Sequence, residues 1–374
     1  MTTLNSLLGS IGKFLNKSTT PSIVGVDIGS SSVKVVQLKQ EKSRIVLETY
    51  GEIALGLYEG KTPGELTSLN NEQLSTVLID VLREANITTK DPYFAIQSNA
   101  SLVFLLSLPR ITERDLGTTI PNEARKYIPV PLSEVSLDWW VLPENLTSPG
   151  DEQLTTNNDK MEVFVAAIRN DALKKYQSII AGAGLSAGSF EMEVFSALRS
   201  TLKNDLSPIL LVDFGASGVR IAAVEYGVVK KFHTVNRGSY HLSMALAQSL
   251  SIPFERAEKL KKEVGLTGTG YNDEVEKARE ILQSNIPYLF SEIGSVLQSY
   301  EQEYRKAINK IYLVGGGANL AGFREDLEKR FSVPVYNSNA FSRAQAPVFL
   351  EKVLEQSSGT FAVAIGCALK QLQS

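Results

Sequence analysis

Alternating apolar positions dominate the start of the chain. Residues 23–38 form two β-rich apolar runs on either side of a short polar turn, which predicts a β-hairpin. Residues 43–54 alternate between apolar and polar side chains and predict a third strand, whereas residues 71–85 carry apolar side chains at helical spacing. A further strand is expected at residues 93–97. Strands combined with an amphipathic helix are typical of an α/β layer.

A second group of strands is expected between residues 100 and 168. Three apolar runs predict these strands, at residues 102–108, 135–142 and 161–168. A helix is expected after Thr112, and Pro121 should interrupt or restart it because proline lacks the N–H that a helix interior needs. The polar stretch 143–160 is expected to be an exposed tip. The group predicts a subdomain inserted into the first layer.

The second half repeats the pattern of the first hairpin. Residues 209–224 again place two apolar runs around an Asp-x-Gly turn, 186 positions later (213 − 27 = 186). A coincidental surface turn has no reason to recur at the same point of the second half. Two related halves are therefore expected to face each other across a cleft. Six positions match: Val26, Asp27, Gly29, Ser31, Val33 and Lys34 align with Val212, Asp213, Gly215, Ser217, Val219 and Arg220.

Helices and strands alternate through the rest of the chain. Strands are expected at residues 228–235 and 311–314, the latter running into three consecutive glycines. The last helix carries small side chains that allow close packing, as a hinge between two halves would require. The expected helices are 170–180, 191–202, 240–250, 253–264, 273–306 with a division at Pro287, 320–331 and 360–369.

Composition and charge narrow the class of protein. The 374 residues are 43% hydrophobic and 21% charged, which suits globular cores in roughly two to three domain units. A net charge of −3 argues against a nucleic-acid partner. The single cysteine excludes an internal disulfide, and the two histidines are too scattered to join it in a zinc-type cluster. No apolar run approaches the ~20 residues that span a bilayer, so we expect a cytoplasmic protein.

Residues 1–20 are expected to form an amphipathic N-terminal tail. Two roles are open for it, docking against a membrane surface or partner helix, and packing on its own domain. Its apolar positions fall at helical spacing, at Leu4, Leu7, Leu8, Ile11 and Leu15.

The first turn carries the groups that a phosphate site needs. Gly29 permits close approach of the backbone to an anion, and Ser30, Ser31 and Ser32 supply hydroxyl donors. Asp27 suits a phosphate site when a cation such as Mg²⁺ lies between the two negative charges. Taken alone, the turn has the composition of an ordinary surface turn as well, and its recurrence favours the site.

Three further features each have two interpretations. The triple glycine at residues 315–317 is either a tight strand-to-helix turn or a place where a base or phosphate approaches the backbone. Glu191 and Glu193 are either first-turn acids favoured by the helix dipole or carboxylates that orient water or a metal-bound ligand. The mixed charges at residues 257–263 form either a solvated helix face or a ligand contact.

Together these features resemble the actin-like ATPase superfamily and, within it, the PilM family of type IV pilus assembly proteins. The resemblance implies an α/β, actin-like ATPase fold, in which two RNase H-like lobes surround a nucleotide cleft and the first lobe carries an inserted subdomain. It covers residues 22–370 and rests on the order of the motifs Val-Asp27-Ile-Gly29-Ser-Ser-Ser-Val-Lys34, Glu-Ala-Arg-Lys-Tyr127-Ile-Pro129 with Leu137-Asp138, Val212-Asp213-Phe-Gly215 and Leu-Val-Gly315-Gly316-Gly317-Ala-Asn-Leu-Ala-Gly-Phe323.

The same resemblance implies ATP and Mg²⁺ as cofactors. Asp27 and Asp213 would bind Mg²⁺ through water, and Glu191 or Glu193 would orient the attacking water. The sequence leaves open whether ATP is hydrolysed appreciably or serves mainly as a structural ligand. The remaining nucleotide contacts would be Gly29, Ser30, Ser31, Ser32 and Lys34 on one side, Gly215, Ala216 and Ser217 on the other, Gly315, Gly316 and Gly317 at the nucleoside, and Glu258 and Lys261 at the ribose and base.

A partner and a division into domains also follow from the resemblance. A groove beside the inserted subdomain would receive the cytoplasmic N-terminal peptide of the inner-membrane protein PilN. The protein would act as a cytoplasmic scaffold at the inner face of the membrane, together with other pilus platform components and with self-association into a ring. The expected units are residues 21–99 and 169–205 with the C-terminal helix 357–374 as the first lobe, 100–168 as the insertion, and 206–356 as the second lobe with a small subdomain at about 239–309.

Two alternatives belong to other functional classes. One is a filament-forming division protein similar to FtsA, and the other is a small-molecule kinase of the same superfamily, which would need a catalytic base beside a sugar pocket. Two departures from the family pattern also stand out. Asn236-Arg237-Gly238 occupies a place where relatives often have paired glycines, and Pro121 lies in a segment that is usually an unbroken helix.

Overall fold

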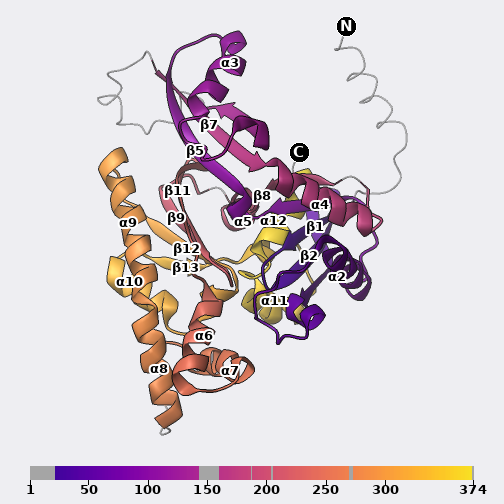
Figure 1. The fold of residues 1–374 in the computed structure, drawn as a ribbon, viewed down its shortest axis with the longest axis vertical. Coiled ribbons are helices and arrows are strands. Elements are labelled where there is room, and N and C mark those ends of the chain that lie inside the picture. Colours follow the sequence, from indigo (N-terminus) through magenta and orange to yellow (C-terminus); the bar gives the residue numbers. More distant parts are fainter. Residues whose placement is uncertain (1–21, 143–159, 187, 204, 269–272, 373–374) are drawn as a thin grey trace.

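The computed structural model of the chain describes residues 22–142, 160–186, 188–203, 205–268 and 273–372 (Figure 1). The tail predicted at residues 1–20 and nearly all of the tip predicted at 143–160 lie outside these residues. Three β-sheets organise the described part, two of five strands and one of three.

The first sheet has the strand order β3-β2-β1-β4-β8. Strand β1 is antiparallel to β2 and parallel to β4, so its two neighbours belong to a hairpin and to a crossover connection. One face packs on helices α2 (Asn71–Glu84) and α4 (Asn170–Gly182), as the alternation predicts. The strands are β1 (Ser22–Ile28), β2 (Ser32–Glu41), β3 (Arg44–Ala54), β4 (Pro92–Ile96) and β8 (Ser189–Met192).

The second sheet repeats this plan in the order β11-β10-β9-β12-β13. Strand β9 is antiparallel to β10 and parallel to β12, which is the arrangement of β1 with β2 and β4. Its strands are β9 (Ile209–Phe214), β10 (Val219–Glu225), β11 (Val228–Val235), β12 (Lys310–Val314) and β13 (Val335–Asn337). The helices that share its outer core are α6 (Ser239–Leu250), α7 (Phe254–Val264), α8 (Asp273–Asn285), α9 (Pro287–Tyr304) and α10 (Phe323–Phe331).

The inner faces of both sheets meet in one shared core. Helix α12 (Ala362–Leu372) lies in this core with α5 (Glu193–Thr201), and α11 (Glu351–Ser357) leads into it. The small side chains of α12 allow the close packing that the sequence predicted. A Cβ at Gly25 would lie 1.9 Å from the Ala364 carbonyl oxygen, and a Cβ at Gly366 would lie 1.8 Å from that of Ser196. Neither position has room for any side chain.

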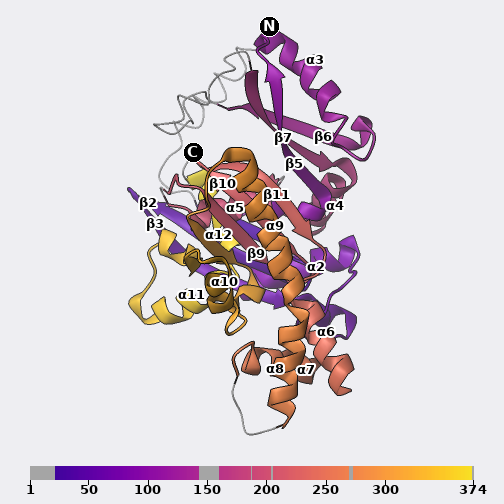
Figure 2. The same cartoon turned by 90° about the vertical axis from the view of Figure 1, so that its left-hand side faces the viewer.

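The third sheet, β5-β7-β6, stands beside the other two (Figure 2). Its strands are β5 (Ser101–Pro109), β6 (Val135–Val141) and β7 (Lys160–Arg169), and helix α3 (Glu113–Ala124) packs on one face. On this face Leu106, Val163 and Val165 are buried under α3. Other apolar side chains of the same face are only partly buried, among them Phe104 and Trp139. Helix α3 therefore covers part of an apolar face and leaves the rest partly open.

The prediction that Pro121 interrupts the helix is wrong. Helix α3 runs through Pro121 without a break, and the Arg125 N–H still bonds to the Pro121 carbonyl at 3.2 Å. Proline forfeits one hydrogen bond, the one to the carbonyl four residues earlier. That carbonyl belongs to Gly117, which is exposed and has open space around its Cα, so water can take the bond.

Two helix starts and two short strands also differ from the prediction. Glu191 and Met192 belong to strand β8, and the helix predicted from residue 191 begins at Glu193. The helix expected at residues 320–331 begins at Phe323, because the glycines first form a short 3₁₀ turn, Gly316–Asn319. Strands β8 and β13 have three or four residues each and show no alternation long enough to detect. Among the described residues, none of the helices is both long and apolar enough to cross a bilayer.

Candidate functional site

The two Asp-x-Gly hairpins have the same local geometry. In the first, Asp27 lies opposite Lys34 in the β1–β2 register, and the Gly29 N–H bonds to the Ser32 carbonyl at 2.9 Å. In the second, Asp213 lies opposite Arg220 in the β9–β10 register, and the Gly215 N–H bonds to the Gly218 carbonyl at 3.0 Å. The sequence repeat is therefore also a structural repeat.

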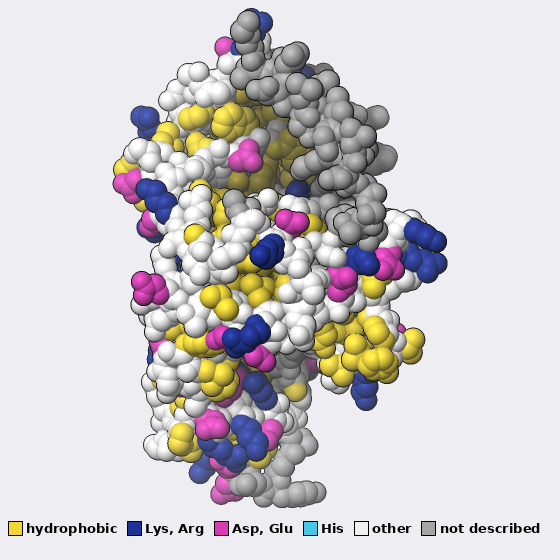
Figure 3. Space-filling model, turned by 90° about the vertical axis from the view of Figure 1, so that its right-hand side faces the viewer, with side chains coloured by type: hydrophobic (Ala, Val, Ile, Leu, Met, Phe, Trp, Pro, Cys, Tyr) yellow, Lys and Arg dark blue, Asp and Glu magenta, His cyan; other side chains and the backbone are white. Residues whose placement is uncertain are grey.

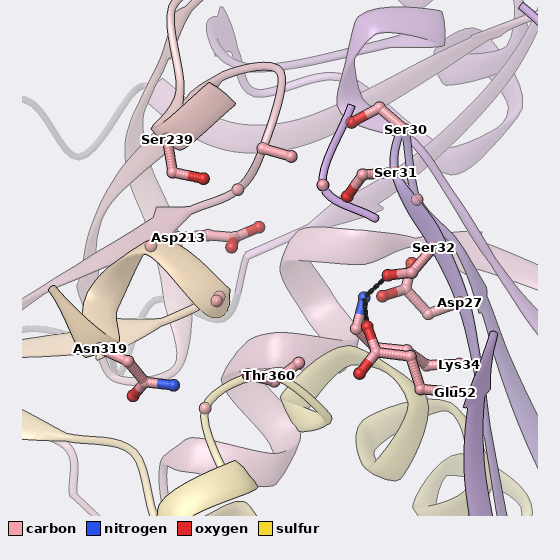
Figure 4. A pocket seen from close by; sticks show the side chains of 18 of the residues that line it. Asp27, Ser30, Ser31, Ser32, Lys34, Glu52, Asp213, Ser239, Asn319 and Thr360 are labelled. Atoms are coloured by element: carbon pink, nitrogen blue, oxygen red, sulfur yellow. Dashed lines mark hydrogen bonds and ion pairs between the residues drawn. The ribbon is translucent and has the colours of Figure 1, made fainter. Parts of the chain in front are cut away.

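A cleft of about 710 Å³ lies between the two hairpins (Figure 4). Ser217 and Glu191 are not among the residues that line it. The other candidate residues are, namely Asp27, Gly29, Ser30, Ser31, Ser32, Lys34, Glu193, Asp213, Gly215, Ala216, Glu258, Lys261, Gly315, Gly316 and Gly317.

The first hairpin supplies hydroxyl groups and a held lysine. Figure 4 shows the hydroxyls of Ser30 and Ser31 pointing into the cleft, with Asp213 on the opposite wall. The Lys34 ammonium donates to the Ser32 hydroxyl at 2.8 Å and lies 3.5 Å from a Glu52 carboxylate oxygen. These contacts fix the lysine at the wall of the cleft, where it can meet an anion.

The pKa values of Asp27 and Asp213 are both raised above the ordinary value of an aspartate. Burial raises the pKa of Asp27 to about 6, an effect that Lys34 partly opposes. Burial raises the pKa of Asp213 to about 7, where Arg220 opposes the rise and the charges of Glu193 and Asp27 add to it. The cations opposite the two carboxylates, Lys34 and Arg220, therefore offset the cost of burial only in part.

This arrangement fits a Mg²⁺ ion. Magnesium is held in proteins by one or two carboxylates, with substrate phosphates and waters completing its shell. No group of three acids, histidines or cysteines in the described part of the chain makes a closed protein cage. Asp27 and Asp213 could therefore hold the ion only together with water or a ligand.

The triple glycine, Gly315 to Gly317, lines the cleft on the side of the second lobe. Gly315 has φ +83°, and a Cβ there would lie 2.6 Å from an Asp213 carboxylate oxygen. A Cβ at Gly317 would lie 2.6 Å from the Phe214 ring. The Gly315 N–H bonds to the Gly359 carbonyl at 2.9 Å, which ties the turn to the segment before α12. Backbone rather than side chain therefore borders the cleft here.

Glu258 and Lys261 form a buried polar pair at the α6–α7 end. Lys261 Nζ lies 2.7 Å from Glu258 Oε2, and Ser243 and Lys262 also contact this carboxylate. Burial would raise the pKa of Glu258, but these partners outweigh it and leave the pKa below its ordinary value. Burial lowers the pKa of Lys261, which Glu258 partly offsets. The carboxylate is held ionised and ready to accept hydroxyl hydrogen bonds.

The two acids proposed to orient water lie in different places. Glu191 is paired with Arg199 through two hydrogen bonds, one of them 2.7 Å from Nη2 to Oε2, and lies outside the lining of the cleft. Its position does not support the predicted role. Glu193 does line the cleft, where it accepts the Ser98 N–H at 2.9 Å. Its Oε1 also lies 2.9 Å from Arg220 Nε.

Sequence reasoning missed several lining residues. Ser239, Asn319 and Thr360 face the cleft (Figure 4), and two of them, Ser239 and Thr360, directly follow a glycine. The glycine of Asn236-Arg237-Gly238 supplied the signal for the first of them. A Cβ at Gly238 would lie 2.4 Å from the Gly215 carbonyl oxygen, which receives the Ser239 N–H at 3.0 Å. Gly238 therefore lets this turn pack directly against the second Asp-x-Gly hairpin.

A family model for the type IV pilus assembly protein PilM matches residues 25–372. The chain belongs to the PilM family. A solved chain of a PilM-PilN type IV pilus biogenesis complex matches with a TM-score of 0.77 and 20% identity, over 95% of this chain and all of the other. The functional role in type IV pilus assembly is thus shown at the level of the family.

Two further solved structures place the PilM fold among its neighbours. MreB 5 of Spiroplasma citri bound to AMPPNP matches with a TM-score of 0.56 and 13% identity, over 95% of this chain and 97% of the other. The ethanolamine utilization protein EutJ from Carboxydothermus hydrogenoformans gives 0.54 and 17%, over 95% and 91%. The predicted actin-like ATPase fold is confirmed by these likenesses.

Proposed function

We propose that this PilM-family protein is an ATP-binding scaffold that binds the cytoplasmic N-terminal peptide of PilN. The observation that carries the nucleotide half is the pair of equivalent Asp-x-Gly hairpins that face each other across one cleft. Backbone N–H groups at such turns, with hydroxyl donors beside them, suit phosphate oxygens. A cleft lined from both lobes lets one ligand hold the lobes together.

Each wall has its own part in this proposal. Gly29 to Ser32 with Lys34 would bind phosphates from the first lobe, and Gly215 and Ala216 from the second. Asp27 and Asp213 would hold Mg²⁺ through water, and the ion would supply positive charge between the carboxylates and the phosphates. Gly315 to Gly317 would border the nucleoside, and the ionised Glu258 would accept ribose hydroxyls.

Slow hydrolysis is part of the same proposal. A carboxylate that orients water must have a free oxygen of high basicity directed at that water. Glu193 Oε1 is already engaged by the Ser98 N–H and by the Arg220 guanidinium. Both contacts occupy Oε1, so this oxygen has little capacity left to accept a hydrogen bond from water. ATP would therefore serve mainly as a ligand that holds the two lobes in a fixed relation.

The partly open face of the third sheet is the proposed PilN site. Figure 3 shows hydrophobic side chains gathered in a hollow over this part of the molecule. Phe104 stacks on Tyr127, whose ring is 52% exposed, with centroids 4.9 Å apart. Such a partly covered apolar surface is typical of a groove for a short segment with apolar side chains. The partly buried members of the face include Leu102, Phe104, Leu137, Trp139 and Val141.

A peptide pull-down tests the partner half. Phe104→Glu should weaken capture by the PilN cytoplasmic segment at least about 10-fold, because it places a charge in the apolar contact. Trp140→Ala is the matched control, since Trp140 is 57% exposed and alternates to the opposite face of β6. Equal capture by both variants would remove this face as the binding site, and no capture by the wild type with or without ATP would remove PilN as the partner.

A pH titration tests the nucleotide half. Affinity for Mg-ATP should fall as the pH is lowered from about 8 to about 5.5, because Asp27 and Asp213 take up protons near pH 6 and 7 and then no longer hold the cation. Isothermal titration calorimetry with excess Mg²⁺, which keeps the nucleotide metal-bound, measures the change. Constant affinity over this range would contradict the assigned metal ligands.

The unliganded protein should show the opposite dependence. Both pKa values lie above the ordinary 3.8, so between these limits the folded state binds more protons than the unfolded state. The stabilisation is full below about pH 3.8 and is lost as pH rises through 6 and 7. Melting temperatures compared with an Asp27→Asn/Asp213→Asn variant isolate this contribution from that of other groups.

The proposed setting is the cytoplasmic face of the inner membrane, reached through PilN. Three further parts of the proposal stay predictions. They are contacts with other platform components, self-association into a ring, and the division into lobes at the expected boundaries.

A further inference from the structure

Arg220 and Lys34 occupy equivalent hairpin positions but have different ionic partners. Lys34 lies opposite Glu52 of β3 in the β2–β3 register, so its own sheet supplies a counter-ion. Arg220 lies opposite Thr234 of β11, which carries no charge. The repeat is therefore incomplete on the second side, and the Arg220 charge must be balanced from elsewhere.

The counter-ion of Arg220 comes from the other lobe. Its Nε lies 2.9 Å from Oε1 of Glu193, the first residue of α5, which follows strand β8 of the first sheet. The two side chains are only 12% and 8% exposed. The ion pair thus crosses from the second lobe to the first and lies at the base of the cleft.

Two further acids act on the same guanidinium. Burial alone would lower the pKa of Arg220, and the charges of Glu193, Asp213 and Asp27 outweigh it. Glu193 is the carboxylate in contact with Arg220, Asp213 lies opposite it in the β9–β10 register, and Asp27 has Lys34 as its stronger counter-charge. Without a counter-charge a guanidinium is costly to bury, and the loss of one partner from a buried pair is strongly destabilising.

The Arg220 guanidinium has N–H donors that could bind a further acceptor. In the described structure Arg220 makes one hydrogen bond to the backbone, from Nη1 to the Gly218 carbonyl, and it is long at 3.4 Å. A Cβ at Gly215 would lie 2.9 Å from Nη1, so the guanidinium lies directly behind the turn that faces the cleft. Arginine presents five N–H donors in a planar fork that matches phosphate oxygens.

We propose that Arg220 is a built-in counter-ion of the cleft, which balances its acids when no divalent cation is bound and lets a nucleoside triphosphate bind without one. The part about nucleotide rests on the proposed function. Mg²⁺ strengthens binding in the wild type but is not required for it. Removing Arg220 leaves Glu193 without its ion-pair partner and Asp213 without the cation opposite it, so binding becomes dependent on the metal.

Nucleotide titrations in EDTA and in excess Mg²⁺ test this inference, with ATP as the probe. In the wild type, the ratio of Kd in EDTA to Kd in Mg²⁺ should be modest, on the order of 10. In Arg220→Gln the ratio should increase by at least a further factor of about 10. Arg220→Lys keeps the charge and should restore most of the metal-free binding. Lys231→Gln is the matched control, because Lys231 pairs with Glu303 at the surface of β11.

Unliganded stability gives a second, independent measurement. In EDTA, Arg220→Gln should melt below the wild type, and Arg220→Gln/Glu193→Gln should recover more than the two single variants predict by addition. If the double variant shows strict additivity, the interlobe pair carries no coupling and the counter-ion role is overturned.

The outcomes separate this inference from the proposed function. A wild type that binds ATP with Mg²⁺ but loses it entirely in EDTA overturns the inference and leaves the nucleotide site intact. The inference is also overturned if Arg220→Gln weakens ATP binding by the same factor in EDTA and in Mg²⁺. A wild type that binds ATP in neither condition overturns the proposed nucleotide site and the nucleotide part of the inference, and the melting data then decide alone whether Arg220 balances the acids.

Discussion

Asp27→Ala and Asp213→Ala are each expected to weaken Mg-ATP binding by at least about 10-fold, as loss of a metal-side carboxylate implies. The reason is electrostatic, because each carboxylate faces the cleft with a pKa raised by burial. A bound cation offsets the cost of burying the charged carboxylate. Titration calorimetry in excess Mg²⁺ measures the loss directly.

The same two variants should be at least as stable to heat as the wild type without ligand. Removing a partly desolvated carboxylate also removes its desolvation cost, so weaker binding cannot be attributed to unfolding. Asp91→Ala, at an exposed acid far along the chain from both hairpins, serves as the control for a simple change of net charge. Unchanged binding in both cleft variants would remove the proposed metal and nucleotide site.

Gly366→Ala is expected to be among the most destabilising alanine substitutions in the chain, with a loss of at least about 3 kcal/mol. The added Cβ would lie 1.8 Å from the Ser196 carbonyl oxygen and 2.4 Å from its carbon. Both atoms are backbone of α5, so no side chain can rotate away. Helix α12 and helix α5 must therefore separate, which opens the core that both sheets share.

Gly117→Ala makes the identical atomic change in another helix and is the matched control. Open space surrounds Gly117 in α3, and alanine is favoured over glycine in a helix by up to about 1 kcal/mol. Urea unfolding of the two variants should move in opposite directions from the wild type. Similar stability of Gly366→Ala and the wild type would show that α12 does not pack as tightly as described.

The sequence was informative wherever a pattern was long or repeated. Strands β1 and β2 are β-rich apolar runs, β3 alternates over many residues, and the Asp27 hairpin recurs at Asp213 with six matched positions. Both features reflect local constraints, since alternation follows from the pleat of a strand and a tight turn needs small residues. The cleft could be predicted from them because equivalent hairpins at equivalent sheet positions must meet.

What the sequence could not predict are pairings between distant residues. Nothing near Glu191 indicates that Arg199 holds it away from the cleft, or that Glu193, two residues on, reaches Arg220 in the other lobe. Helix α3 likewise continues through Pro121 because the Gly117 carbonyl is open to solvent, which the proline itself does not indicate. These outcomes depend on three-dimensional proximity, which spacing along one chain does not encode.

The position of α12 has a consequence for synthesis on the ribosome. Strand β2 ends at Glu41, but the helix that covers its inner face begins only at Ala362, after the whole second lobe. At roughly 5–20 residues per second, the two are separated by at least roughly 15 s of translation. During that time the apolar face with Val36 and Leu38 lacks its cover, so the N-terminal lobe cannot mature first. The nascent chain must be kept from aggregating until its last helix has emerged.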